Sequence, residues 1–328
     1  MTDADATRSS RSPRPADGVD PLPVTEAATL CRVVEENVGR VIVGHDEAIE
    51  HVVTTVLARG HVLLEDVPGV GKTMLARAIA RSLDCTFKRI QFTPDLLPAD
   101  ITGVNVFDKA SREFEFQPGP VFANVVLGDE INRAPPKTQS ALLEAMEEDQ
   151  VTVDGETRAL PDPFTVIATQ NAVEPERTYE LPFAEIDRFT KKLSLGYPDS
   201  DEETALLGRT VGHHPIETLE PVAGLEELRR ARETVAIITV REPVRRYAAE
   251  LAAYTREHAE IGASPRGTIA LVRAAQARAV TEGRDYVLPD DVQREVPAVF
   301  GHRVRRRVGG PSGDGPVVKD ALERVPVE

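Results

Sequence analysis

One stretch of this 328-residue chain indicates its fold more strongly than any other. It reads Val62-Leu63-Leu64-Glu65-Asp66-Val67-Pro68-Gly69-Val70-Gly71-Lys72-Thr73-Met74. An apolar run of strand length enters a Pro/Gly turn, and a helical pattern leaves it. Gly69 and Gly71 lack a Cβ, so backbone N–H groups there can surround phosphate oxygens at the start of a helix. Lys72 is placed to reach the β- and γ-phosphates, and the Thr73 hydroxyl is placed to bind Mg²⁺. The pattern predicts a phosphate-binding loop.

One position of this loop departs from the usual sequence. The pattern G-x-x-x-x-G-K-[ST] begins with glycine, and Asp66 stands there instead. A Gly-Lys-Thr alone occurs by chance at helix starts, but the preceding strand and the following helix favour a nucleotide site. The residues expected to contact the nucleotide are Asp66, Val67, Pro68, Gly69, Val70, Gly71, Lys72, Thr73 and Met74.

Two later strands end in polar side chains. The apolar run Asn124–Leu127 leads through a glycine to Asp129 and Glu130. After a phosphate-binding loop, such a pair predicts the second half of an ATP site, in which Asp129 holds Mg²⁺ and Glu130 deprotonates the attacking water. The strand Phe164–Thr169 delivers Asn171 at its end. Ligands bind at the carboxyl ends of parallel strands, so Asn171 is expected to sense the γ-phosphate or to fix the water.

An apolar turn precedes the first strand. Helical patterns over Val24–Val38 and His45–Ala58 flank Val41-Ile42-Val43-Gly44. Val43 and Gly44 are candidates for the floor of an adenine site. The alternative for this turn is plain core packing.

The rest of the chain completes an α/β fold followed by helices. Short strands are expected at 87–91 and 192–195, and hairpins at 102–117 and 150–158. Helical patterns follow at 201–211, 223–235, 242–259, 265–282 and 289–303. The predicted organisation is a disordered tail at 1–20, an α/β core at 21–198, an all-helical domain at 199–308 and a mobile tail at 309–328.

Composition limits the classes of partner. The chain has 39 Lys and Arg against 54 Asp and Glu, a net charge of −15, which argues against broad non-specific DNA binding. With few aromatic residues and no Trp, the spread acidity resembles that of halophilic proteins and predicts better folding in molar KCl; an ordinary acidic bacterial protein is the alternative. The sequence contains no signal peptide and no apolar run of about 18 residues, so we expect a cytoplasmic protein without membrane insertion.

A basic run ends the helical region, formed by Arg303, Arg305, Arg306 and Arg307. A solvated face or ion pairs between subunits are favoured here over a nucleic-acid patch.

Four motifs together resemble the MoxR family of AAA+ ATPases over residues Val24 to Val304. They lie at Leu63–Thr73, at Gly128–Gln139 with its Asp-Glu-Ile-Asn-Arg-Ala core, at Ile167–Asn171 and at Gly262–Arg266. The resemblance implies a parallel sheet of order 5-1-4-3-2, a helical lid, the cofactors ATP and Mg²⁺, and a homo-oligomeric ring, usually a hexamer. Both hairpins would point toward the ring pore.

The same resemblance assigns three arginines. Arg188 falls at the position of the arginine finger that reaches a neighbouring subunit's γ-phosphate. Arg266 falls at the sensor-2 position of the lid, and its action within or between subunits stays open. Arg133 is a candidate for a further contact across the subunit boundary.

The expected function is an ATP-hydrolysing chaperone that remodels or activates partner complexes, with von Willebrand factor A domain proteins as the implied partners. A nucleic-acid motor related to replicative helicases is one alternative. A second is an assembly ATPase of the magnesium-chelatase or gas-vesicle type. A third is a scaffold that binds ATP with negligible turnover.

Overall fold

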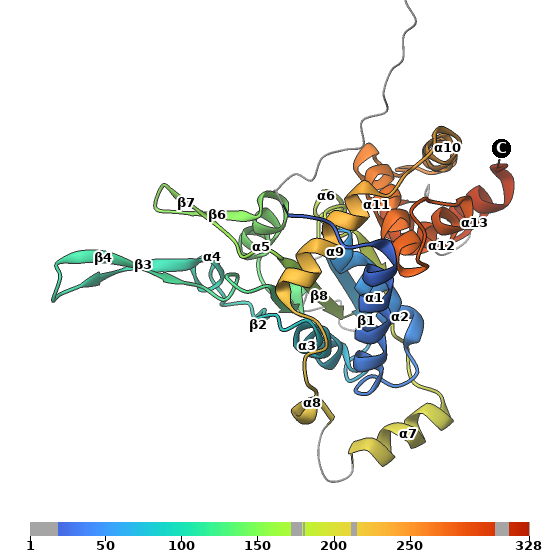
Figure 1. Cartoon of the computed structure of the whole chain (residues 1–328). Helices are drawn as coiled ribbons and strands as arrows, with labels where there is room; N and C mark the ends of the chain where they lie inside the picture. The colour runs from blue at the N-terminus through green and yellow to red at the C-terminus, as the bar shows by residue number, and fades with distance from the viewer. Residues whose placement is uncertain (1–18, 172–178, 180, 211–214, 306–314, 328) are drawn as a thin grey trace, which may run out of the picture.

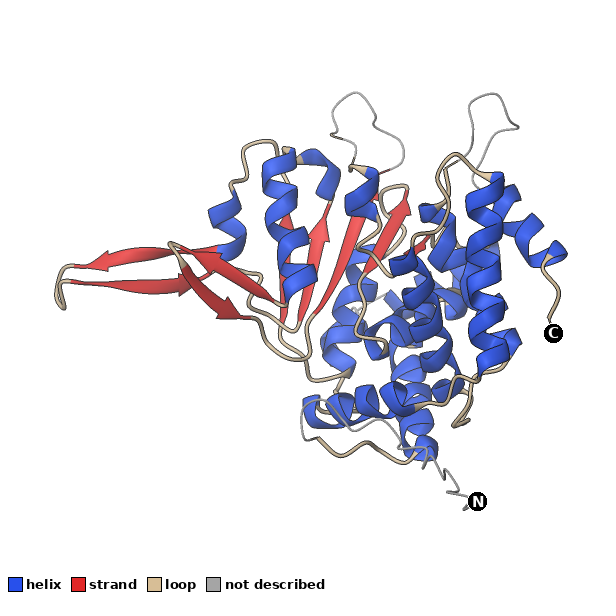
Figure 2. Ribbon diagram, turned by 90° about the horizontal axis from the view of Figure 1, so that it is seen from above, coloured by secondary structure: helices blue, strands red, loops and turns tan. Residues whose placement is uncertain are grey.

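The computed structural model describes residues 19–171, 179, 181–210, 215–305 and 315–327 (Figure 1). At its centre lies a parallel sheet flanked by helices (Figure 2). Its strands are β1 (Val62–Asp66), β2 (Phe87–Gln91), β5 (Val125–Asp129), β8 (Thr165–Asn171) and β9 (Lys191–Leu193). They are arranged in the order β2-β5-β8-β1-β9, all parallel, which confirms the predicted order 5-1-4-3-2.

The central strands β5, β8 and β1 are buried on both faces, as their apolar runs predict, whereas the edge strand β2 is largely exposed. Successive side chains of a strand point to opposite faces. On β1, Val62 and Leu64 join one core cluster while Leu63 joins the other. The first cluster includes α1 (Val24–Gly39), α2 (Asp46–Leu57) and α3 (Lys72–Ser82); the second includes α4 (Pro98–Thr102) and α5 (Pro136–Glu148). This layering leaves the carboxyl edge of the sheet for polar residues.

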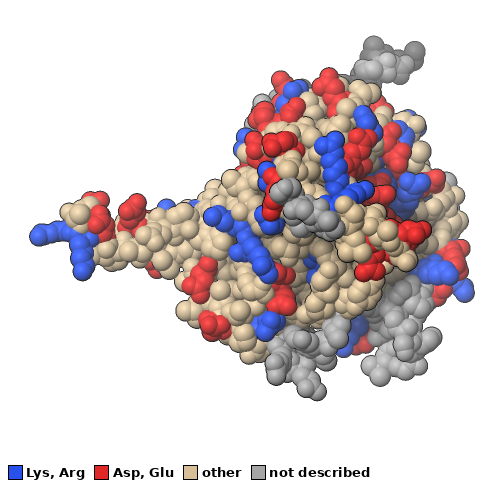
Figure 3. Space-filling model, turned by 90° about the horizontal axis from the view of Figure 1, so that it is seen from below, with Lys and Arg blue, Asp and Glu red and all other residues tan. Residues whose placement is uncertain are grey.

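Two antiparallel hairpins project from the same side of the molecule (Figure 1). One pairs β3 (Gly103–Asp108) with β4 (Glu113–Pro118), and the other pairs β6 (Gln150–Val153) with β7 (Glu156–Ala159). Asn105 Nδ2 donates to Asp154 Oδ2 at 2.8 Å, which ties the hairpins together. Figure 3 shows the longer hairpin standing clear of the body, with basic side chains at its tip.

The C-terminal helices form the lid. They are α7 (Ser200–Thr210), α8 (Pro215–Thr218), α9 (Leu225–Ile237), α10 (Glu242–His258), α11 (Pro265–Thr281), α12 (Pro289–Phe300) and α13 (Gly315–Arg324). The helix α13 lies in the segment predicted to be a mobile tail, and this part of the prediction was wrong. Val317, Val318 and Ala321 are buried, and α13 packs against α10 and α12. The Gly/Pro-rich start of the segment concealed the short apolar repeat that follows it. Of the predicted N-terminal tail, residues 1–18 lie outside the described residues.

A buried ionic cluster joins the lid to the core. Lys191 at the start of β9 and Glu295 in α12 have fully buried side chains, and Nζ lies 2.6 Å from Oε2. Arg278 of α11 donates from Nε to the other oxygen of Glu295 at 2.6 Å, and Lys191 Nζ also donates to Thr54 Oγ1 of α2 at 2.6 Å. Burial alone would raise the pKa of Glu295, but Lys191, His51 and Arg278 hold it below its usual value. The cluster therefore holds core and lid together in charged form.

We expect Lys191→Met to destabilise the chain by about 3–5 kcal/mol, because the buried carboxylate of Glu295 loses one of the two cations that lie 2.6 Å from it. The matched control is Lys192→Met, since Lys192 Nζ makes a part-exposed ion pair of the same 2.6 Å length with Glu65. That pair should contribute no more than about 1 kcal/mol. Denaturant unfolding of both variants checks the difference, and equal losses would contradict it.

Candidate active site

The phosphate-binding loop has the backbone that the sequence predicts. Gly69 and Gly71 have φ of 89° and 94°, in the left-handed region that favours glycine. Helix α3 begins at Lys72, directly after the loop. Lys72 Nζ donates to the carbonyl oxygen of Asp66 at 2.9 Å. Burial lowers the pKa of Lys72, and the carboxylates of Asp66, Asp129 and Glu130 oppose that shift. The ammonium group thus lies within electrostatic reach of the acidic pair.

The Asp66 side chain explains the departure from the usual loop sequence. Its Oδ2 accepts from Ser194 Oγ at 3.1 Å, from Leu195 N at 2.5 Å and from Gly196 N at 2.9 Å. The carboxylate therefore holds the chain segment that follows β9, and its other oxygen, Oδ1, accepts from the Val67 amide of the loop at 3.1 Å. These bonds replace the predicted continuation of the strand to Leu195, because the amide of Leu195 now donates to a side chain. A contact between Asp66 and a nucleotide would therefore be made by its backbone and not by its side chain.

We expect Asp66→Ala to destabilise the chain by about 2–3 kcal/mol, because the amide N–H groups of Val67, Leu195 and Gly196 lose a charged acceptor. Asp66→Gly, which restores the usual first glycine, should lose as much. Ser194→Ala, which removes one of the three donors to Oδ2, serves as the milder control. Unfolding in denaturant measures all three, and an Asp66→Gly variant as stable as the parent would refute this assignment.

The acidic pair lies at the carboxyl end of β5, held by its neighbours on both sides. Thr169 of β8 donates from Oγ1 to Asp129 Oδ1 at 2.6 Å and accepts from the Glu130 amide at 2.8 Å. Arg89 of β2 donates from Nε to Asp129 Oδ2 at 3.0 Å. Thr169 and Arg89 were not among the predicted site residues. Their side chains fix the carboxylate of Asp129 between them.

Glu130 has a strained backbone and three polar neighbours. Its φ is 56°, in the left-handed region that non-glycine residues rarely adopt. Its Oε2 accepts from Gln91 Nε2 and from Arg133 Nη1, both at 2.8 Å, and Asn171 Nδ2 lies 3.5 Å from Oε1. Arg133 thus contacts Glu130 of its own chain, where the resemblance led us to expect a contact with another subunit.

Asn171 is positioned as the sequence predicts, beside the phosphate-binding loop. It pairs in register with Asp66 across β1 and β8. Its Oδ1 is buried and has no hydrogen-bond partner among the described residues. A buried acceptor of this kind is free to accept from a bound water.

A cavity of about 410 Å³ lies beside the segment that Asp66 holds after β9. Gly44 lines it, together with Ser194 and Leu195, the residues held by Asp66. The lid closes it through Arg294, Pro297 and Ala298. Val43, the other predicted adenine contact, is not among its lining residues. Of the two predicted adenine contacts, the cavity therefore includes only Gly44.

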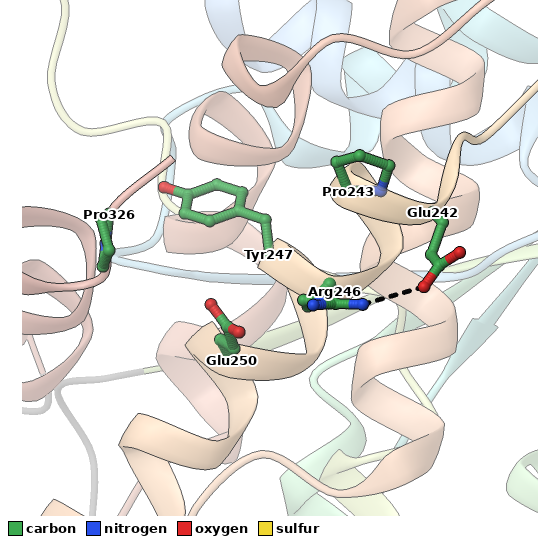
Figure 4. Close-up of a pocket in the computed structure, with 6 residues that line it drawn as sticks. All are labelled: Glu242, Pro243, Arg246, Tyr247, Glu250 and Pro326. Carbon is green, nitrogen blue, oxygen red and sulfur yellow. Dashed lines mark hydrogen bonds and ion pairs between the residues drawn. The ribbon is translucent and has the colours of Figure 1, made fainter. Parts of the chain in front are cut away.

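A second hollow of about 230 Å³ lies in the lid, between α10 and the end of the chain (Figure 4). Tyr247 and Pro326 flank it, and Arg246 Nη2 donates to Glu242 Oε1 at 2.9 Å along its edge. None of the residues predicted to bind nucleotide lines it. It lies apart from the candidate active site.

The two remaining candidate arginines meet at a different place. Arg188 Nε lies 3.2 Å from Glu147 Oε2, and Arg266 Nη2 donates to Glu147 Oε1 at 3.0 Å. Glu147 lies near the end of α5, and Arg266 is the second residue of α11. The two side chains are 25% and 43% exposed. Two arginines from core and lid therefore share one surface carboxylate.

Two general properties concern the described residues. No cluster of three or more His, Cys, Asp or Glu side chains among them could hold a metal ion by itself. In the same part of the chain, no helix has the length and hydrophobicity needed to cross a lipid bilayer.

Comparisons with known proteins agree with this site. The model of the ATPase family associated with various cellular activities (AAA) matches residues 61–191, and that of the AAA lid domain matches 251–325. The uncharacterized protein YeaC of Bacillus subtilis is 53% identical over 271 residues, which is 82% of this chain and 85% of YeaC. Chaperone MoxR1 of Mycobacterium tuberculosis is 42% identical, over 88% of this chain and 79% of its own.

A solved structure shows the same fold. The crystal structure of a candidate ATPase from Cytophaga hutchinsonii aligns with a TM-score of 0.86 at 35% identity, covering 93% of this chain and 97% of that one. Family models, relatives and structure thus match both the α/β part and the lid. The chain belongs to the MoxR family of AAA ATPases.

Proposed function

We propose that this ATPase works as an oligomeric, Mg²⁺-dependent chaperone that remodels or activates partner protein complexes. The proposed ATP hydrolysis is supported by one observation. Four side chains lie together at one edge of the sheet, namely Lys72, Asp129, Glu130 and Asn171. The chaperone part is supported by the relative named Chaperone MoxR1. Proteins with von Willebrand factor A domains are the partners we expect from the family resemblance.

The chemistry follows from the roles of these side chains. Thr73 and Asp129 supply the oxygen ligands that Mg²⁺ prefers, and the ion would neutralise phosphate charge when bound. Glu130 takes a proton from a water molecule, whose oxygen attacks the γ-phosphorus. The bond between that phosphorus and the β–γ bridging oxygen breaks, and ADP and phosphate leave. Asn171 orients the water, and Lys72 holds the phosphates.

We propose that Arg188 and Arg266 act together on the ATP of a neighbouring subunit. Both side chains contact Glu147 at the end of α5. The described polar contacts of the acidic pair instead come from Arg89, Gln91, Arg133, Thr169 and Asn171. Part-exposed arginines held away from their own acidic pair are suited to a site on another subunit. A ring would bring the two halves together.

A trapped complex tests the function. Glu130→Gln should bind ATP without hydrolysing it, so the ATP-bound assembly and its client stay together. Affinity capture in ATP and Mg²⁺ is compared with capture by Lys72→Ala, which should not bind ATP. A protein enriched only on the trap supports the chaperone, and a von Willebrand factor A domain protein supports the partner class. If both variants capture the same proteins, ATP does not control partner binding and the proposal fails.

A further inference from the structure

We propose that Asp187 is a positioning residue that couples the arginine finger to the lid, so that Arg188 and Arg266 act as one unit. The inference rests on the proposed action of these arginines between subunits. Asp187 precedes Arg188 in the chain and contacts two separate parts of the lid. Neither contact was expected from the sequence.

The first contact is a buried ion pair with Arg303. Arg303, at the end of the 3₁₀ turn Gly301–Arg303, has a side chain only 2% exposed, and its Nε donates to Asp187 Oδ1 at 2.6 Å. The prediction that Arg303 belongs to a solvated basic face was therefore wrong. Because a buried guanidinium needs acceptors for its donors, it is held in a fixed place.

The same guanidinium also holds the backbone around Arg188. Nη2 donates to the carbonyl oxygens of Asp187 at 2.8 Å and Phe189 at 2.6 Å, and Nη1 donates to that of Thr190 at 3.0 Å. The carbonyl groups on both sides of Arg188 are thus bonded to one lid side chain. This fixes the direction in which the Arg188 side chain leaves the core.

The second contact joins Asp187 to the helix that carries Arg266. Ser264 donates from Oγ to Asp187 Oδ2 at 3.1 Å. The same hydroxyl accepts from the Gly267 amide at 3.1 Å and so caps the N-terminus of α11. A Cβ on Gly267 would lie 2.7 Å from Arg303 Cδ, so this helix start packs directly on the buried arginine. The carboxylate of Asp187 therefore contacts both the arginine that holds the backbone around Arg188 and the start of the helix that carries Arg266.

Glu147 completes the arrangement at the surface. It contacts both guanidinium groups, as described above, while Asp187 holds their backbones from behind. Two cations that must reach one γ-phosphate gain from this fixed spacing, because a displacement of about 1 Å can lower the rate by about 100-fold. Asp187 therefore affects the transition state of ATP hydrolysis in the neighbouring subunit by positioning Arg188 and Arg266. It makes no contact with that ATP itself.

The test variant is Asp187→Asn, which keeps the size of the side chain and an acceptor for Arg303. We expect kcat to fall by about 10- to 100-fold while the Kd for ATP stays within about twofold. The matched control is Glu233→Gln, since Glu233 is buried and makes an ion pair with Arg59 between lid and core, away from the two arginines. The control should keep its turnover. A melting temperature for each variant separates misplacement from unfolding.

Mixed oligomers give the decisive readout. Lys72→Ala subunits bind no ATP but carry intact arginines, and Asp187→Asn subunits bind ATP but present misplaced ones. Mixing the inactive Lys72→Ala preparation with the slowed Asp187→Asn preparation should raise turnover above that of either alone, because some Asp187→Asn sites then face intact arginines. A merely structural defect of the Asp187→Asn subunit would not be repaired in this way.

Each outcome has one meaning. If Asp187→Asn keeps the parental turnover while Arg188→Ala loses most of it, the role of Asp187 is overturned and the proposed action of the arginines stands. Parental turnover of Arg188→Ala overturns the proposed action of the arginines themselves. If Asp187→Asn does not fold, Ser264→Ala replaces it, since that variant keeps the ion pair with Arg303 and removes the hydroxyl that both links Asp187 to α11 and caps that helix. Failure of the mixture to recover turnover, with either variant, overturns the inference.

Discussion

Replacing Arg188 by alanine should lower kcat by roughly 10³–10⁵-fold, the usual contribution of an arginine finger to phosphoryl transfer. The guanidinium is expected to neutralise charge that develops on the γ-phosphate oxygens of the neighbouring subunit. Arg188 lies beside a single surface carboxylate, and its side chain is 25% exposed. Little stability should be lost, because part-exposed ion pairs contribute no more than about 1 kcal/mol.

Steady-state ATP turnover and nucleotide binding measure the effect of Arg188→Ala. The Kd for ATP should hardly change, because the guanidinium is expected to act on charge that develops in the transition state and not on bound ATP. Arg246→Ala is the matched control: Arg246 is an exposed arginine paired with Glu242 on the lid, and its loss should leave kcat unchanged. A loss of ATP affinity equal to the loss of turnover would show that Arg188 binds ATP itself and does not act on the transition state.

Replacing Glu130 by glutamine should lower kcat by about 10²–10⁴-fold and leave ATP bound. The amide has nearly the same size and keeps an oxygen acceptor, but it cannot take a proton from water at neutral pH. The donors Gln91 and Arg133 hold one carboxylate oxygen, and Asn171 lies near the other. Their contacts keep the side chain at the site in either variant.

Single-turnover hydrolysis of bound ATP tests this role directly, because it removes product release from the measurement. Glu144→Gln provides the control, since Glu144 is an exposed carboxylate of α5. If Glu130→Gln cleaved bound ATP at the parental rate, another group would have to accept the proton. The strained backbone of Glu130 would then need a different explanation.

The sequence predicted the parallel sheet and the main site residues for one physical reason, whereas the strand order was implied by the family resemblance. Phosphate loop, acidic pair and Asn171 each follow a strand, and parallel strands bring such ends to a common edge. Lys72, Asp129, Glu130 and Asn171 could therefore be placed together before any coordinates were known. The family resemblance supplied the two arginines, which spacing along the chain could not have assigned.

Side-chain partners between distant segments could not be read from the chain. Arg89 and Gln91 alternate on a predicted strand, but their contacts with the acidic pair require that β2 lie next to β5. Asp66 looked like a loop residue because the amides after β9 that donate to its carboxylate are far away in sequence. Arg303 looked exposed because it belongs to a run of arginines.

By itself, the sequence determined which chemistry the chain carries, because the groups that bind phosphate and activate water are encoded in short motifs. The tertiary structure decided how those groups are held. It turned Asp66 toward the end of β9, placed Arg188 and Arg266 on Glu147, and buried Arg303 against Asp187. The reason is that a charged side chain becomes fixed only where packing removes water and supplies a partner, and that partner usually comes from another part of the chain.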